Sequence, residues 1–193
     1  MVSWILFGYA AGSVPFAFLL ARRAGIDVRV SGSGNVGAAN VLRTTSRSLG
    51  VAVMALDVAK GLIAVLIAQS VTAGAAATAA VGAAAVVGHV YPVWLRFHGG
   101  KGVAVAAGVF TVLAPIATGV AACLFLATVW ITRVVSLGSV IASITLPSIV
   151  WWSGASAPVL LAAAGVAALI LFRHRANLMR LASGTERRVG EHV

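Results

Sequence analysis

Charged side chains are scarce in this sequence of 193 residues, because Asp, Glu, Lys and Arg together make up 9% of it. Soluble domains usually contain about 25%. So few charges cannot cover the water-facing surface of a soluble fold of this size. The hydrophobic content of 61% also excludes intrinsic disorder. The composition is that of an integral membrane protein.

Acidic residues and cysteine are also scarce. The single cysteine, Cys123, cannot form an internal disulfide, and the four histidines and four acidic residues lack close metal-ligand spacing. We therefore expect no metal site. Fourteen Lys and Arg give a net charge of +10. In an apolar chain this excess indicates cytoplasmic loops and anionic headgroups or substrates rather than nucleic acid.

Apolar runs between the basic clusters predict the membrane helices, since one span needs about 20 helical residues. The runs are 3–21, 49–69, 75–95, 103–132, 139–152 and 158–172. We interpret 103–132 as two short helices that turn near Pro115–Gly119, and the last two runs as short helices joined at Ser153–Ala157. The prediction is an all-α integral membrane protein, a single domain over 1–193 with seven transmembrane helices, several of them short. Five spans are the alternative.

The basic residues set the expected orientation. No positive charge precedes the first run, and Arg22 and Arg23 follow it, which argues against a cleaved signal peptide. The N-terminus is then outside, the C-terminus is cytoplasmic, and every basic cluster faces the cytoplasm.

The first cytoplasmic loop combines three glycines with Ser33, Asn35, Asn40 and Arg43. Successive backbone amides in such turns form anion-binding nests, and an arginine supplies a fork for phosphate. The alternative is a flexible loop that only joins two helices.

A second glycine-rich segment, Gly99-Gly100-Lys101-Gly102, directly precedes an apolar run. A phosphate there meets backbone amides, a helix N-terminus and a lysine together. The segment is not a Walker A motif, because no Ser or Thr follows the lysine. A lysine that extends to the membrane surface between capping glycines is the alternative.

Two further pairs of polar residues have helical spacing. Asp57 and Lys60 lie on one face of a predicted span, either as a functional intramembrane pair or as a pair that only orients the helix. His174 and Asn177 share one side of a helix in the basic tail. His174 is a candidate general base, and an amphipathic tail at the membrane surface is the alternative.

In this order, these segments resemble the bacterial acyl-phosphate-dependent glycerol-3-phosphate acyltransferase family, PlsY. The resemblance covers almost the whole chain. It rests on Ser33–Ala38, Asn40–Arg43, Asp57–Gly61, Gly88–His89, Pro92, Phe97–Gly102, Val135–Leu137 and His174–Asn177. Ala39 stands where the family usually has Thr, His98 where Lys is common, and Tyr91 where Phe is common.

The resemblance implies transfer of a fatty acyl group from acyl phosphate to the 1-hydroxyl of sn-glycerol 3-phosphate. The products are 1-acyl-sn-glycerol 3-phosphate (lysophosphatidic acid) and phosphate, in the first acylation step of phospholipid biosynthesis. It implies a multi-pass enzyme in the bacterial cytoplasmic membrane, with its active site facing the cytoplasm. It implies no cofactor, no acyl-CoA and no covalent acyl-enzyme, and its partners are the two substrates and membrane lipid.

The resemblance and the loop chemistry together predict two sets of site residues. The catalytic set, which holds glycerol 3-phosphate, is Ser33, Arg43, Lys101, His174 and Asn177. The substrate- and phosphate-binding set is Gly34, Asn35, Gly37, Ala38, Asn40, Lys60, Gly99, Gly100, Gly102 and Ser136. A transporter of small phosphates and a scaffold whose loops bind lipid headgroups are alternative functions that would use the same basic loops.

Overall fold

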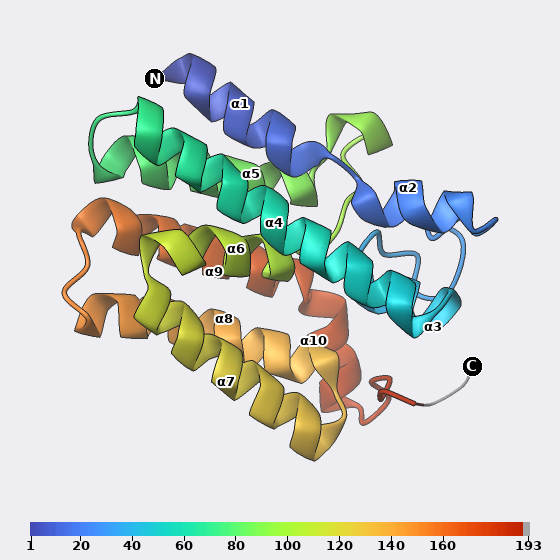
Figure 1. The fold of residues 1–193 in the computed structure, drawn as a ribbon. Helices are drawn as coiled ribbons and strands as arrows, with labels where there is room; N and C mark the ends of the chain where they lie inside the picture. Colours follow the sequence, from blue (N-terminus) through green and yellow to red (C-terminus); the bar gives the residue numbers. More distant parts are fainter. Residues whose placement is uncertain (191–193) are drawn as a thin grey trace.

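The computed structural model describes residues 1–190, and this part of the chain is helical with no strand (Figure 1). Helices are the expected solution for such an apolar sequence, because in lipid a backbone must satisfy its own hydrogen bonds. The elements are α1 (Val2–Ser13), α2 (Phe16–Arg23), α3 (Ala38–Thr44), α4 (Arg47–Val71), α5 (Ala75–Val90), η1 (Val93–Leu95), α6 (Val103–Leu113), α7 (Pro115–Thr132), α8 (Val135–Trp152), α9 (Ala157–Arg173) and α10 (Arg175–Ala182).

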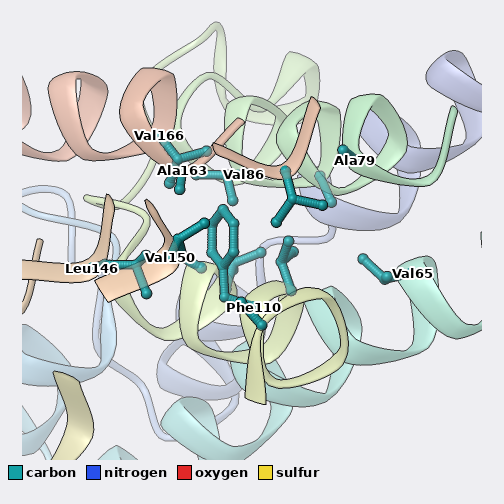
Figure 2. Packing of buried hydrophobic residues seen from close by; sticks show 14 of the residues in the cluster. Val65, Ala79, Val86, Phe110, Leu146, Val150, Ala163 and Val166 are labelled. Atoms are coloured by element: carbon teal, nitrogen blue, oxygen red, sulfur yellow. The ribbon is translucent and has the colours of Figure 1, made fainter. Parts of the chain in front are cut away.

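The long helices pack side by side in one bundle. Its most extensive contacts join α1 to α5, α4 to α6 and α7 to α8, and α9 packs against both α5 and α8. Phe110 of α6 lies at the centre, surrounded by small side chains such as Val86 of α5, Val150 of α8 and Val166 of α9 (Figure 2). Small residues allow close helix packing in membranes, and they bring α4, α5, α6 and α9 together around one core.

Glycines set the close approach of α1 to α5. A Cβ atom on Gly12 would lie 1.9 Å from the backbone oxygen of Ala85, and one on Gly88 would lie 2.1 Å from that of Tyr9. The two backbones therefore touch directly. The Tyr9 hydroxyl also donates a 2.8 Å hydrogen bond to the carbonyl of Tyr91, which ties the end of α5 to the first helix.

Five helical segments are long and apolar enough to cross a membrane, or six if the bent pair of α9 and α10 is one span. The two helices expected in 103–132 are present and are joined at Ala114, but only α6 is short, because α7 has 18 residues. The helix expected at 139–152 instead begins at Val135, so it has 18 residues and was wrongly expected to be short. The first run is interrupted at Pro15, which has no N–H to continue the helix.

The two ends of the bundle differ in chemistry. The N-terminus, the α4–α5 turn and the α8–α9 loop lie together at the left end in Figure 1, whereas α2, α3 and α10 lie at the right end. The α4–α5 turn and the α8–α9 loop, 72–74 and 153–156, have no charged residue. The loops and helices at the right end carry the basic clusters.

Candidate active site

Asn40 organises the first glycine loop at the basic end. It is only 1% exposed, its Nδ2 donates to the carbonyls of Val28 and Ser31 at 3.0 Å each, and its Oδ1 accepts from the Ser33 amide at 2.9 Å. Its hydrogen-bonding atoms are thus used within the loop. Asn40 shapes the loop and presents Ser33, which is exposed.

One glycine of this loop adopts a left-handed backbone conformation, and another leaves space for a neighbouring side chain. Gly34 has φ +70°, the left-handed region that glycine tolerates best. A Cβ atom on Gly37 would lie 2.8 Å from Nδ2 of Asn35, so the Asn35 side chain packs directly against Gly37. Gly37 precedes α3, in which Ala38 is the first residue and Arg43 lies in the last turn. The short helix therefore separates the loop from the arginine.

The second glycine segment packs tightly against the end of α5. The amide of Gly99 donates to the carbonyl of Val90, and that of Gly100 donates to the carbonyl of His89, both at 3.1 Å. A Cβ atom on Gly99 would lie 2.2 Å from the His89 oxygen. These two amides are therefore engaged within the protein, and the sequence-based expectation that they cradle phosphate does not fit this arrangement.

The backbone amides that remain available to a ligand follow Gly100 directly in the chain. Within residues 1–190, those of Lys101, Gly102 and Val103 have no hydrogen-bond partner, and no side chain caps α6. Gly102 has φ +92° and turns the chain into α6. The N-terminus of α6 thus offers donors beside the Lys101 side chain.

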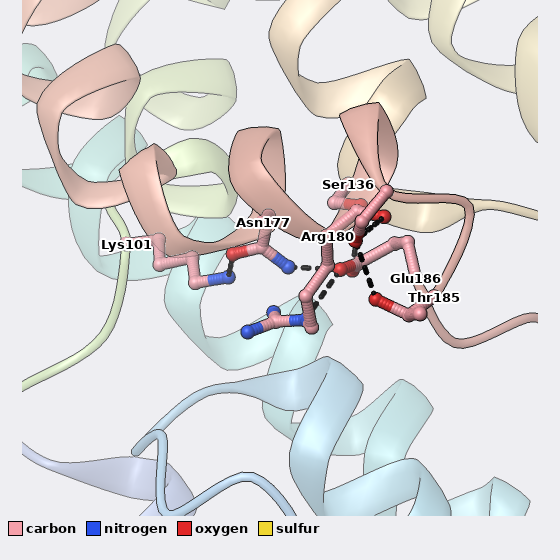
Figure 3. Close-up of polar contacts among 7 residues, drawn as sticks. Lys101, Ser136, Asn177, Arg180, Thr185 and Glu186 are labelled. Atoms are coloured by element: carbon pink, nitrogen blue, oxygen red, sulfur yellow. Dashed lines mark hydrogen bonds and ion pairs between the residues drawn. The ribbon is translucent and has the colours of Figure 1, made fainter.

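A polar network connects Lys101 to the C-terminal segment (Figure 3). The Lys101 Nζ donates to Oδ1 of Asn177 on α10, and Nδ2 of Asn177 donates to Oε1 of Glu186 at 2.6 Å. Ser136 of α8 donates to the same Glu186 oxygen at 2.8 Å, and Arg180 pairs with the other carboxylate oxygen at 2.7 Å. Three predicted site residues therefore meet in one network whose centre is Glu186.

The network changes the acidity of its members. Burial, with smaller contributions from the neighbouring Arg180 and Arg43, lowers the pKa of the Lys101 amine to about 8, although Glu186 opposes the shift. Burial also disfavours ionisation of Glu186, but hydrogen bonds from Asn177 and Ser136 and the ion pair with Arg180 hold the pKa of its carboxyl below the usual value. The site thus keeps a carboxylate among cations.

Two other predicted residues border this network. Arg43 is close enough to interact electrostatically with Glu186 and to be repelled by Arg180 and Arg187. His174 is 2% exposed, and its Nδ1 lies 2.8 Å from the carbonyl of Ile170. Because a carbonyl oxygen only accepts, Nδ1 carries the hydrogen, which leaves Nε2 for other contacts.

The predicted Lys60 lies elsewhere. It forms a buried cluster with Asp57 and His89 behind Gly100, rather than joining the Lys101 network. The two glycine loops do meet, because a Cβ atom on Gly100 would lie 2.9 Å from the carbonyl oxygen of Val36 in the first loop. The first and second loops are therefore neighbours, and Lys60 lies beneath their contact.

The positions that differ from the usual family pattern form none of the hydrogen bonds or ion pairs of the network. His98 is exposed, and its Nδ1 lies 2.6 Å from the Arg96 carbonyl. The ring of Tyr91 lies 5.6 Å from the guanidinium of Arg173, which in turn donates to the carbonyl of Gly99 at 3.2 Å. Ala39 lies in the first turn of α3.

The site residues predicted from the sequence do not include Glu186, Arg180 or Arg173. Each is one charge within a basic tail, and no spacing distinguishes it there. The available signal was the rarity of acidic residues, because Glu186 is one of only four in the chain. An acidic residue kept among so many cations indicates a specific pairing.

The arrangement suits phosphate esters. Cationic Arg43, Lys101 and Arg180 gather beside free helix amides, which favours binding of phosphorylated molecules. No group of three or more His, Cys, Asp or Glu residues that could hold a metal occurs in the part of the chain that is described.

Comparisons with known proteins identify the family of this chain. The family model for glycerol-3-phosphate acyltransferase matches residues 2–184. The protein of that name from Trichlorobacter lovleyi is 43% identical to this chain, and the alignment covers 95% of this chain and 94% of the relative. The one from Bradyrhizobium diazoefficiens is 47% identical, and the alignment covers 97% of this chain and 94% of the relative. The crystal structure of PlsY (YgiH), an integral membrane glycerol 3-phosphate acyltransferase, in its glycerol 3-phosphate form has a TM-score of 0.94 at 39% identity, covering 98% of this chain and 95% of its own. The lysophosphatidic acid form has a TM-score of 0.91. This chain belongs to the glycerol-3-phosphate acyltransferase family.

Proposed function

We propose that this enzyme transfers a fatty acyl group from acyl phosphate to the 1-hydroxyl of sn-glycerol 3-phosphate. The products are 1-acyl-sn-glycerol 3-phosphate and inorganic phosphate. The observation that carries the proposal is the Lys101–Asn177–Glu186 network beside Arg43 and the free amides of α6. It supplies positive charge for two phosphates at one end of an apolar bundle.

The residues divide between the two substrates. Glycerol 3-phosphate is held by the side chains of Ser33, Arg43, Lys101, His174 and Asn177. The amides of Lys101, Gly102 and Val103 receive the acyl phosphate group, while Gly99 and Gly100 serve by packing closely against α5. The Glu186 carboxylate orients Asn177 and Ser136.

The enzyme needs mainly to position the two substrates and to neutralise the charge of their phosphates, because an acyl phosphate already contains a good leaving group. The 1-hydroxyl oxygen attacks the carbonyl carbon and forms the new ester bond. The bond from that carbon to the bridging oxygen breaks, and phosphate leaves with both bonding electrons. A phosphate oxygen of a substrate takes the hydroxyl proton, so no acyl-enzyme forms.

The basic residues determine the orientation that we propose in the membrane. The seven apolar segments form seven spans, with α1 and α2 as one broken span and α6 as a short one. The N-terminus is then outside, the C-terminus is cytoplasmic, and the basic site faces the cytoplasm of a bacterial cell. Placement in the cytoplasmic membrane gives the site access to soluble glycerol 3-phosphate and to a lipid-like donor.

The test is an assay of the purified protein in detergent with glycerol 3-phosphate and either palmitoyl phosphate or palmitoyl-CoA. We expect lysophosphatidic acid and released phosphate from the acyl phosphate alone, without added metal. Product from the CoA ester alone would overturn the donor. Phosphate flux into liposomes without lipid product would instead favour transport.

Two substitutions test the residue assignment. Arg43→Ala or Lys101→Ala should remove about 99% of turnover, since each deletes a charge that holds a phosphate. Arg23→Ala is the matched control, because Arg23 is an exposed arginine in the last turn of α2 and should keep the wild-type rate. Wild-type rates in both site variants would refute the assignment.

A further inference from the structure

Asp57, Lys60 and His89 form a buried polar cluster outside the Lys101 network. The Lys60 Nζ lies 2.8 Å from Oδ1 of Asp57 and 3.0 Å from Nδ1 of His89, and it donates to the carbonyl of Val14 at 2.8 Å. The three side chains are 2%, 7% and 8% exposed. One ammonium group thus connects α4, α5 and the break between α1 and α2.

The contacts determine which nitrogen of His89 carries the hydrogen. A lysine ammonium only donates, so Nδ1 of His89 must accept in the 3.0 Å contact. The 2.8 Å ion pair with Asp57 stabilises the charged form of Lys60 that this contact requires. His89 is therefore neutral, with its hydrogen on Nε2.

The other edge of the His89 ring supports Gly100. A Cβ atom on Gly100 would lie 2.1 Å from Nε2 and 2.8 Å from Cε1 of His89. The amide of Gly100 also donates to the carbonyl of the same histidine at 3.1 Å. His89 therefore fixes Gly100 through both its ring and its backbone, and Lys101 is the next residue in the chain.

A narrow cavity adjoins this cluster. It is lined by Lys60, His89 and Gly100 together with Pro15 and Val36, among others. Its volume of about 10 Å³ leaves room for about one water molecule. The His89 ring thus borders open space on one side, and the hydrogen bond from Lys60 restrains it there.

We propose that His89 is a positioning residue for Lys101: the Asp57–Lys60 ion pair holds its ring in the Nε2–H tautomer, and the ring sets the place of Gly100 and thereby the direction of the Lys101 side chain. The inference rests on the proposed function of Lys101. A buried ion pair by itself contributes little net stability, since desolvation offsets its attraction. A role in placing another group therefore explains its presence better than stability does.

The first test replaces the ion pair by apolar residues of similar size, Asp57→Leu with Lys60→Met, which leaves no unpaired charge. We expect the double variant to unfold within about 4 °C of wild type. Its kcat/KM for glycerol 3-phosphate should fall at least about tenfold, because a displacement of about 1 Å disrupts productive geometry. Thr78→Val, a buried polar residue near the opposite end of α5, is the control and should keep the wild-type kcat/KM.

A smaller loss of kcat/KM in a folded double variant would overturn the inference. The second test does not depend on the folding of the double variant, because it records the NMR spectrum of wild-type protein with ¹⁵N-labelled histidine. The spectrum of His89→Asn lacks the His89 signals and thereby identifies them. We expect a protonated Nε2 and an unprotonated Nδ1 at neutral pH. A protonated Nδ1 would refute the tautomer and the inference with it.

The two experiments also separate this inference from the proposed function. Wild-type protein without turnover would refute the function, and the NMR spectrum would still decide the tautomer. Wild-type turnover together with an unchanged kcat/KM in the double variant would refute only the role of His89.

Discussion

In the proposed function, Lys101 carries a positive charge in a place from which the protein excludes much of the water. Burial lowers the pKa of its amine to about 8, with contributions from Arg180 and Arg43. In the proposed function the protonated form binds phosphate, so the fraction of competent enzyme should fall as the pH rises through 8. Below that pH the lysine is charged, and its contribution is complete.

We therefore expect kcat/KM for glycerol 3-phosphate to decline above about pH 8, as measured between pH 6 and 10. Lys101→Arg supplies the comparison, because a guanidinium stays charged throughout this range. In that variant the decline should move to higher pH, even if the rate at neutral pH is lower. An alkaline decline at the same pH in both proteins would show that another group causes it.

At the residue scale, local patterns in the sequence were enough to single out Lys101 and Asn177, which the structure brings into contact. They could not indicate Glu186, because it lies after α10 and its partners come from α8 and α10. Only the bend of 58° between α9 and α10 brings the tail back toward Lys101. Asn40 illustrates the same limit, since its structural role follows from carbonyls 9 and 12 residues away.

At the scale of helices, the contact of α1 with α5 depends on the absence of a side chain at Gly12. Gly12→Ala would place a Cβ atom 1.9 Å from the Ala85 oxygen, so the two backbones must separate. We expect a loss of about 1–3 kcal/mol in stability, seen as a lower unfolding temperature in detergent.

The matched control is Gly165→Ala in α9, where a Cβ atom would meet nothing within 4 Å. Alanine favours the helix by about 0.5–1 kcal/mol over glycine, so this variant should be at least as stable as wild type. Equal unfolding temperatures for Gly12→Ala and wild type would contradict the close contact of the two backbones.

Apolar runs in the sequence predict where the helices lie, but the prolines alone do not predict where a helix is interrupted. Pro15 lies at the break between α1 and α2, whereas Pro147 lies inside α8, which continues to Trp152. Neighbouring helices can compensate a proline in a membrane helix, and such neighbours are not visible in a local sequence. For the same reason, the sequence placed the start of α8 four residues too late.

For the whole molecule, the separation of the two ends makes the orientation testable. Single cysteines at Ser46 and Ser183 mark the basic end, and Ala73 and Ala155 mark the opposite end, all in a Cys123→Ala background. In intact bacterial cells, a membrane-impermeant thiol reagent should label the positions at 73 and 155 and should label those at 46 and 183 only after lysis. The reverse pattern would invert the proposed topology.

The place of Glu186 along the chain has a consequence for biosynthesis. Glu186 follows α10, so the ribosome makes it after every apolar helix of the described chain has been synthesised. A nascent chain that stalls before this residue can insert its helices, yet it leaves Ser136, Asn177 and Arg180 without their common acceptor. We therefore expect that incomplete chains which end before Glu186 are inactive in the membrane.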